Sequence, residues 1–334
     1  MNAVEAGPAL LGAAGVALGA SWLLVWRLER LGERLGLSEA LLGLVAALAA
    51  DAPEITAAAT ALLHHQPNVG AGVVLGSCPF NLAALLGLGA VVAVRIRLHR
   101  RVVVFGGVVA FGLTVVALLT VRADVTPGAG LAVSLIVLAA YVLALGTGLK
   151  GRRLPLPGRA GYWLQAAATE EEAEMEEGVL PPSGTWVDAV IAAVALVVVV
   201  VASVVMEHAA VSLGRAWSVP DIVVGAVWLG AITSLPNAVA AIYLVRRGRG
   251  AATFSTALNS NNLNVIAGLL IPATVLGLGE PSGESVLVAW WCVGLTALTL
   301  LLAYRHRGLT RATGQLIIVG YAAFVVSVVV SALG

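Results

Sequence analysis

The stretch GLVAALAADAPEITAAATALLHH, residues 43–65, places two carboxylates, Asp51 and Glu54, in an otherwise apolar run with Pro53 between them. The nearest Lys or Arg side chains along the chain are Arg34 before this stretch and Arg95 after it. If the stretch lies in a membrane, inserting an aspartate there costs roughly 2.5–3.5 kcal/mol. Such a group must pair with a cationic side chain, bind a cation as a ligand, or carry a proton.

The composition places this stretch in a membrane. The chain is 60% hydrophobic and 11% charged over 334 residues, with a mean hydropathy of +0.98, whereas soluble domains carry about 25% charged residues. Apolar runs recur at about the 20-residue length that a membrane helix needs, and they lack the alternation of a membrane β-barrel. Cys78 and Cys292 both fall in such runs, so no disulfide framework is indicated. The sequence therefore predicts an all-α polytopic membrane protein.

The apolar runs predict ten transmembrane helices. Their expected ranges are 7–28, 38–64, 69–94, 102–122, 128–149, 185–212, 219–245, 251–276, 284–304 and 312–333.

Arg and Lys residues are distributed very unevenly between the predicted loops. Seventeen fall on one side of the membrane, and only Arg122 and Arg215 fall on the other. Because basic residues concentrate in cytoplasmic loops, both termini and the Arg122 and Arg215 loops are expected outside, and the central loop is expected in the cytoplasm. The short central loop and the lack of regulatory domains favour a prokaryotic cell membrane. The net charge of +1 gives no indication of nucleic-acid binding.

Residues 150–184 interrupt the apolar pattern. Pro and Gly are followed by six glutamates within 170–177, a composition typical of a solvated linker. This linker separates a first five-helix repeat, residues 1–149, from a second, residues 185–334. Because each half has an odd number of spans, similarity between the halves relates units of opposite orientation.

The two halves carry matching polar segments, predicted as α-repeats at about 36–95 and 219–276. Residues 43–65 match GAVWLGAITSLPNAVAAIYLVRR, residues 225–247, and residues 70–88 match 250–270. Pro53 and Pro236 fall at equivalent mid-span positions, where a proline kinks or breaks a helix. Irregular backbone in a membrane is tolerated where it is buried in protein or lines a wet cavity. The matched prolines therefore indicate an ion site near the midplane.

Hard, neutral oxygen donors accompany the two carboxylates in these segments. The remaining acids can sit in loops or near span ends, and His64 and His65 are expected at the membrane interface. Oxygen-only donor sets suit Na⁺, Ca²⁺ or K⁺ rather than soft metals. The neutral donors are Ser77, Asn81, Thr233, Ser234, Asn237, Ser260, Asn261 and Asn264.

Four short motifs resemble the α-repeats of the Ca²⁺:cation antiporter superfamily, which includes the sodium/calcium exchangers and whose repeats read roughly GTSLPE and GSNxx[ND]. The motifs are ADAPE (50–54) with GSCPFN (76–81), and TSLPN (233–237) with NSNNLN (259–264). By position, the resemblance implies cation ligands at Glu54, Ser77, Asn81, Thr233, Ser260 and Asn264. Together with Asp51 and Asn237, these residues form the predicted cation site.

The resemblance implies a secondary active cation antiporter that moves Ca²⁺ against Na⁺ or H⁺ by alternating access, with spans 1 and 6 as candidates for the moving pair. The implied partners are inorganic cations and the lipid bilayer, with no cofactor beyond the transported ions. The predicted spans show no nucleophile–base pair and no metal triad of the kind that would suggest an enzyme. The sequence does not fix the oligomeric state, and a monomer is compatible with it.

Departures from the family pattern keep alternatives open. Asn237 stands where the family has its second glutamate, Ala50 replaces a threonine, Asp51 replaces a serine, and Asn264 is an amide where aspartate is common. A Ca²⁺ site in a low dielectric needs about two nearby negative charges, which requires Asp51 to face the site. If Asp51 faces away from the site, a monovalent cation/proton antiporter fits better. A third alternative is a degenerate, non-transporting membrane scaffold.

Overall fold

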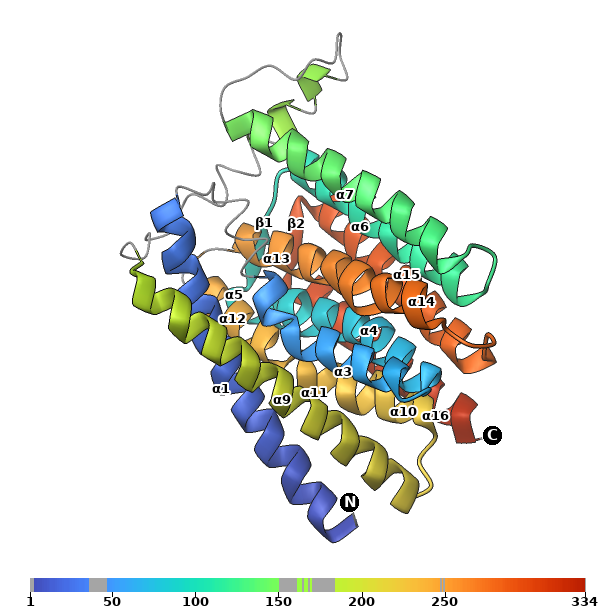
Figure 1. The fold of residues 1–334 in the computed structure, drawn as a ribbon. Coiled ribbons are helices and arrows are strands. Elements are labelled where there is room, and N and C mark those ends of the chain that lie inside the picture. The colour runs from blue at the N-terminus through green and yellow to red at the C-terminus, as the bar shows by residue number, and fades with distance from the viewer. Residues whose placement is uncertain are drawn as a thin grey trace.

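The computed structural model describes residues 3–35, 47–149, 161–163, 165–167, 169, 184–246, 248 and 250–333. Within these residues the chain is almost entirely helical, with its long helices packed side by side (Figure 1). Helices α1 and α9 lie along one edge of the bundle and α7 along the opposite edge. The uninterrupted long helices are α1 (Ala3–Leu35), α6 (Arg100–Val121), α7 (Pro127–Leu149), α9 (Trp186–Ala216), α15 (Gly283–His306) and α16 (Arg311–Leu333).

The central helices are interrupted. The first pair comprises α3 (Ala52–Leu63), which follows a helical turn at 47–50, and the run α4 (Pro67–Asn81), η1 (Leu82–Gly87) and α5 (Leu88–Ala93). The second pair comprises α10 (Asp221–Val223), η2 (Val224–Leu229), α11 (Gly230–Thr233) and α12 (Leu235–Arg246), followed by α13 (Gly250–Leu263), η3 (Asn264–Leu270) and α14 (Ile271–Leu276). The η segments are π-helical turns, which are frequent at functional sites.

The two helix breaks occur at matched positions with nearly the same backbone geometry. Asp51 has φ −83° and ψ −5°, and Ser234 has φ −84° and ψ −1°. Each precedes a proline, Pro53 or Pro236, in the first turn of the following helix, where a proline is accommodated because that N–H has no partner within the helix. The prediction that these prolines interrupt a helix is therefore confirmed, and the break falls two residues before each proline.

Eight helical segments of the described chain are long and apolar enough to cross a membrane. Only residues 47–64 of the predicted span 38–64 are described, and its helix α3 is short. The run 250–276 is more polar than the eight segments, because it carries four asparagines between 259 and 264. The count of ten spans and their inverted arrangement therefore stay predictions. The acidic segment 170–177 lies outside the described residues.

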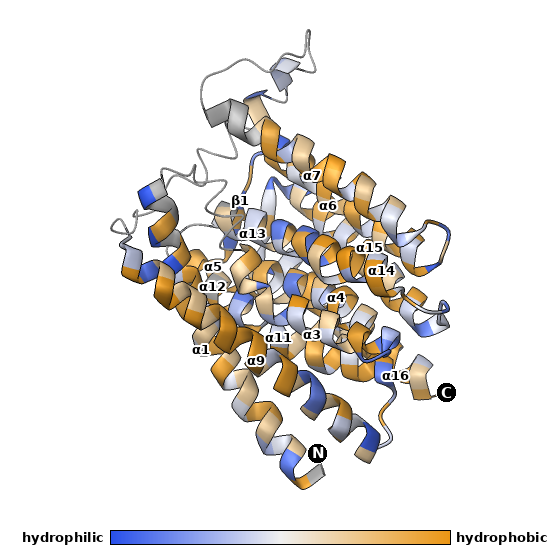
Figure 2. Ribbon diagram, in the orientation of Figure 1, coloured by the Kyte–Doolittle hydropathy of each residue, from blue (hydrophilic) through white to orange (hydrophobic). Residues whose placement is uncertain are grey.

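The outer helices expose apolar side chains along their length. Figure 2 shows α9 coloured mostly hydrophobic between its ends, and its exposed positions include Val194, Val197 and Val201. An exposed valine surface of this kind meets lipid rather than water. Helix α9 packs along α1 and also contacts α3.

A two-stranded sheet departs from the predicted all-α fold. Strand β1 (Arg95–Arg97) pairs antiparallel with β2 (Gly308–Thr310), and Ile96 lies opposite Leu309. Both apolar side chains are buried. The connections before α6 and before α16 lie together, and their backbone groups satisfy one another by pairing. Gly308 is required there, because its φ is +121° and a Cβ would lie 1.9 Å from the Ile96 carbonyl oxygen.

Close backbone contact joins the two halves at the centre of the bundle. A Cβ on Gly76 of α4 would lie 2.2 Å from the Ala226 carbonyl oxygen of η2, and one on Gly225 would lie 2.5 Å from the Val69 carbonyl oxygen. Glycine at both positions lets the helices approach more closely than side chains would allow. This contact brings the helix breaks of the two halves together.

Candidate cation-binding site

The two carboxylates lie at the break that begins α3. Asp51 is the N-cap residue and Glu54 lies in the first turn, and both are 0% exposed. The break turns both side chains toward α11, α12, α13 and η3 of the second half, as their hydrogen bonds show. The structure thus brings Asp51 into the same polar centre as Glu54, the arrangement that the sequence left open.

Asp51 is held by two donors from the second half. Asn237 Nδ2 donates to Asp51 Oδ1 at 2.7 Å, and Ser260 Oγ donates to the same oxygen at 2.6 Å. Asn237 Nδ2 also lies 3.1 Å from Ser260 Oγ, so the three side chains form a closed triangle. Asn237 is the residue that aligns with Glu54 in the repeat.

Glu54 accepts one hydrogen bond at each carboxylate oxygen. Ser234 Oγ donates to Oε1, and Asn264 Nδ2 donates to Oε2. Ser234 Oγ also lies 2.7 Å from the Gly230 carbonyl oxygen of its own helix. Ser234 aligns with Asp51 in the repeat, so the matched helix breaks each supply a side chain to this centre.

Asn81 extends the polar centre toward α4 and α15. Its Nδ2 lies 3.3 Å from Ser260 Oγ and 3.1 Å from Asn261 Oδ1, and Asn261 Nδ2 donates to Cys78 Sγ at 3.3 Å. Cys78 is buried, and its sulfur lies 3.8 Å from Thr296 Oγ1. Nothing in the sequence indicated that Thr296 lies beside this centre, because α15 carries no repeat motif.

The hydroxyls of two predicted ligands, Ser77 and Thr233, are buried but bond to the backbone of their own helices. Ser77 Oγ donates to the Val74 carbonyl at 2.8 Å, and Thr233 Oγ1 donates to the Leu229 carbonyl at 2.7 Å. The other six predicted residues lie in two hydrogen-bonded groups, one around Asp51 and one around Glu54, whereas these two hydroxyls bond to their own helices. Ser234, the neighbour of the predicted ligand Thr233, is the hydroxyl that contacts Glu54. The sequence places Ser234 among the neutral oxygen ligands, but the choice between it and the neighbouring Thr233 depends on the rotation of the helix.

Several oxygens in this centre accept no hydrogen bond from the described residues. A buried acceptor without a partner costs about 1–3 kcal/mol, so a group of them indicates that something else fills their coordination. Carboxylate and amide oxygens are hard ligands that suit Ca²⁺ or Na⁺. The unpartnered oxygens are Asp51 Oδ2, Asn81 Oδ1, Asn237 Oδ1 and Asn264 Oδ1.

Comparisons with known proteins agree with this architecture. The family model described as sodium/calcium exchanger protein matches residues 7–149 and 187–330. A relative, the putative antiporter CaxA of Alkalimonas amylolytica, is 23% identical over 317 residues, which are 90% of this chain and 93% of CaxA.

Solved exchanger structures share the fold. The crystal structure of the H⁺/Ca²⁺ exchanger CAX superposes with a TM-score of 0.71 at 14% identity, covering 98% of this chain and 86% of that one. The sodium–calcium exchanger NCX_Mj superposes with a TM-score of 0.62 at 18% identity, covering 97% and 99%. Because the family match spans most of both halves, this helical membrane protein belongs to the sodium/calcium exchanger family.

Proposed function

We propose that this protein is a secondary active antiporter that moves Ca²⁺ against Na⁺ or H⁺ by alternating access. In this proposal the ion binds near the membrane midplane between two inverted five-helix repeats, residues 1–149 and 185–334, joined by the linker 150–184. The observation that carries the proposal is the fully buried pair Asp51 and Glu54, surrounded by unpartnered oxygens from both halves. The relatives' descriptions as an H⁺/Ca²⁺ exchanger and a sodium–calcium exchanger support the same substrate class.

The charge of the centre favours a divalent ion. In the family pattern each repeat supplies a glutamate, and here the second is replaced by Asn237. Asp51 Oδ1 lies 2.7 Å from Asn237 Nδ2, so the missing negative charge is supplied by the residue that faces the substituted position. Two carboxylates offset a divalent cation, with the amide and hydroxyl oxygens completing the coordination that Ca²⁺ prefers. We assign Ser77 and Thr233 a supporting role, because their hydroxyls bond to their own helices.

A proton can replace the cation at Glu54. Ser234 has one hydroxyl hydrogen but lies within hydrogen-bonding distance of both Glu54 Oε1 and the Gly230 carbonyl oxygen. A protonated Glu54 satisfies all three groups, because it donates to Ser234 while Ser234 donates to Gly230. When the cation leaves, Glu54 therefore takes a proton, and returning ions compete with that proton.

Helices α1 and α9 are the proposed moving pair. They pack along each other at the edge of the bundle, and Arg27 Nη1 and Arg30 Nη1 of α1 lie 2.6 Å and 3.4 Å from Asp188 Oδ1 of α9. This ion pair ties the two helices together. Their lipid-facing apolar surfaces allow them to slide against the centre without exposing charge. We place both termini outside and the linker in the cytoplasm of a prokaryotic cell.

The test is uptake of Ca²⁺ into proteoliposomes under an imposed Na⁺ or pH gradient. We expect uptake that depends on one of these gradients and is lost in Glu54→Gln, while Glu207→Gln, which removes a buried carboxylate of α9 outside the centre, keeps it. Absence of Ca²⁺ uptake by the wild type under both gradients would refute the proposal.

A second candidate is a monovalent cation/proton antiporter. The observation favouring it is that the second half supplies only amides and hydroxyls, Asn237, Ser260 and Asn264, to the carboxylates. It predicts Na⁺- or K⁺-dependent proton movement that Ca²⁺ does not inhibit. A pH-sensitive dye inside the same proteoliposomes distinguishes the two, and no movement of any ion would indicate a non-transporting scaffold.

A further inference from the structure

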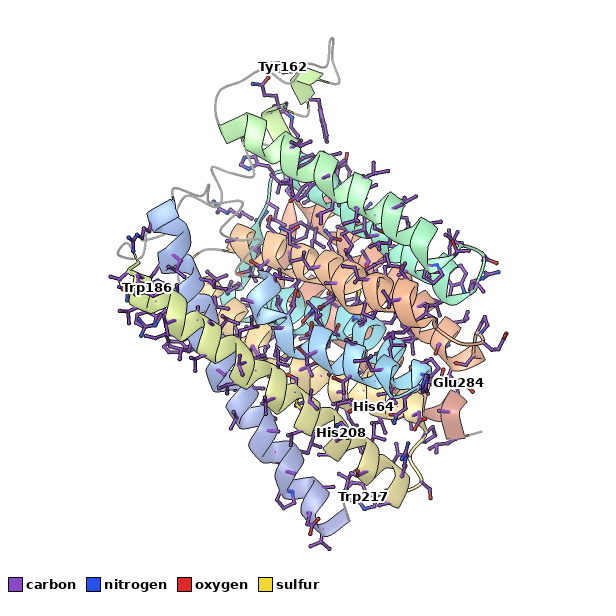
Figure 3. All side chains as sticks on the ribbon, in the orientation of Figure 1. His64, Tyr162, Trp186, His208, Trp217 and Glu284 are labelled. Atoms are coloured by element: carbon purple, nitrogen blue, oxygen red, sulfur yellow. The ribbon has the colours of Figure 1, made fainter. Side chains whose placement is uncertain are left out.

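A second cluster of metal-binding side chains lies away from the carboxylate centre, between α3 and α9. His64 is the C-cap residue of α3, and Glu207 and His208 lie on α9 near its end. Figure 3 shows His64 and His208 next to each other where the two helices adjoin. Glu207 Oε2 lies 3.2 Å from His208 Nδ1 and 4.0 Å from His64 Nδ1. The sequence pointed to none of these residues as ligands.

The burial of Glu207 distinguishes this cluster from a surface ion pair. Glu207 is 1% exposed, and its Oε2 accepts no hydrogen bond from the described residues. Both imidazole rings are exposed and stand edge to face, with centroids 4.7 Å apart. A buried carboxylate that faces two exposed imidazoles is a feature that folding alone does not require, since burying such a group costs free energy.

We propose that His64, Glu207 and His208 bind a transition-metal ion of the Zn²⁺ class. One candidate ligand atom from each residue lies within 4.8 Å of the others. Tetrahedral zinc with bonds of about 2.0–2.1 Å needs ligand atoms about 3.3 Å apart, so small side-chain rotations suffice. Two histidines and one glutamate with an open fourth position for water form an established zinc-ligand set.

The environment of His208 prepares it for this role. Its Nδ1 lies 2.8 Å from the Val204 carbonyl oxygen one turn earlier in α9. Metal-binding histidines commonly donate one ring N–H to a carbonyl, which fixes the ring. Because Nδ1 makes this contact, the metal binds His208 through Nε2 and not through the Nδ1 that lies 3.2 Å from Glu207 Oε2. Imidazole ligands favour Zn²⁺ over Ca²⁺, which prefers oxygen alone. This cluster and the carboxylate centre therefore select different ions.

Metal binding here joins α9 to α3. Since α9 belongs to the proposed moving pair and α3 carries both carboxylates, Zn²⁺ bound across them holds the two in one arrangement and inhibits exchange. The binding site stands on its geometry alone, and the inhibition rests on the proposed function. On the predicted topology the cluster lies near the outer surface, so external Zn²⁺ is the inhibitor.

Binding is tested by titrating the purified full chain in detergent with Zn²⁺ by calorimetry. Excess Ca²⁺ is present, so that the oxygen centre is occupied. We expect one Zn²⁺ per chain, and a dissociation constant at least about tenfold higher in His64→Asn, Glu207→Gln and His208→Asn. The matched control is His65→Asn, which removes the neighbouring exposed histidine at a position with φ of +56° that asparagine tolerates. Thermal unfolding of each variant verifies that it is folded.

The site is refuted if the wild type shows no saturable Zn²⁺ binding, or if the three ligand variants bind as tightly as His65→Asn. Inhibition is tested by adding Zn²⁺ outside proteoliposomes during Ca²⁺ uptake and then removing it with a chelator. We expect reversible inhibition of the wild type and His65→Asn, and at least about tenfold less sensitivity in Glu207→Gln and His208→Asn. Equal inhibition of all four proteins would overturn the proposed link between α3 and α9.

Discussion

Replacing Asp51 by asparagine tests whether its carboxylate supplies the second charge of the cation site. The substitution keeps the shape of the side chain, and the amide Oδ1 can still accept the hydrogen bonds from Asn237 and Ser260. The new NH₂ group takes the place of Oδ2, which accepts no hydrogen bond from the described residues. The variant is therefore expected to fold, with an unfolding temperature in the absence of Ca²⁺ equal to or above that of the wild type.

The loss appears in cation affinity. Removing one partner of a buried charge pair costs about 3–5 kcal/mol. Because each 1.4 kcal/mol is a factor of ten, the Ca²⁺ dissociation constant of Asp51→Asn rises between about 150-fold and about 5,000-fold. At a Ca²⁺ concentration about 100 times the wild-type constant, binding stabilises the wild type by about 2.7 kcal/mol and the variant by less than about 0.4 kcal/mol.

Two measurements check this prediction. The first is thermal unfolding in detergent with Ca²⁺ or with a chelator, where the wild type shifts upward with Ca²⁺ and Asp51→Asn does not. The second is the concentration dependence of Ca²⁺ uptake in proteoliposomes. Glu207→Gln is the matched control, because it neutralises another buried carboxylate without touching the centre. A wild-type Ca²⁺ affinity in Asp51→Asn would refute the assignment of Asp51 as a ligand.

Five further substitutions, of which Gly112→Ala and Ser77→Ala are controls, test contacts in the described structure. Gly76→Ala places a Cβ against the backbone of η2 and is expected to destabilise the protein by about 1–3 kcal/mol, which lowers the unfolding temperature. In the control Gly112→Ala of α6, the added Cβ meets no atom within 4 Å, so the unfolding temperature stays the same or rises. Ser260→Ala removes a donor to a buried carboxylate and weakens Ca²⁺ affinity about tenfold or more in calorimetry. Ser77→Ala changes that affinity by less than about twofold, because its hydroxyl bonds to its own helix; equal effects of the two serine variants would contradict the geometry. Gly308→Ala, at φ +121° against the facing strand, is expected to cost about 1–3 kcal/mol or more in thermal unfolding.

Hydropathy located the helices well because each long apolar run must cover the same hydrocarbon thickness. The predicted span 185–212 corresponds to helix Trp186–Ala216, and 284–304 corresponds to Gly283–His306. Hydropathy carries no information on how connections meet in space, so the pairing of β1 with β2 was missed. The π-helical turns at Leu82–Gly87 and Asn264–Leu270 were also missed, because one extra residue per turn leaves the apolar pattern intact.

The composition of the candidate site was more predictable than its geometry. Matched motifs identified Asp51, Glu54, Asn237 and Asn264 as one set, and hydrogen bonds join each carboxylate to an amide of the second half. Which of two neighbouring hydroxyls faces the centre was not predictable. Successive side chains on a helix point about 100° apart, so the choice between neighbours depends on the rotation of the helix, which only tertiary packing fixes.

The same hydrogen bonds explain why a family pattern with one acid in each half could change without losing charge. Position 237 and position 51 belong to different halves, but a hydrogen bond joins their side chains. Moving the acid from 237 to 51 shifts the negative charge by about one hydrogen-bond length, about 3 Å, and keeps it beside the same oxygens. Both acids then stand at the start of α3, so the two charges stay together while α1 and α9 slide past the centre. If an acid is restored at position 237 while Asp51 is kept, the site contains a third negative charge that a divalent ion cannot offset. Asn237→Asp should thus impair Ca²⁺ release unless it is combined with Asp51→Ser, and uptake by the double variant close to that of the wild type would show that the two positions serve one role.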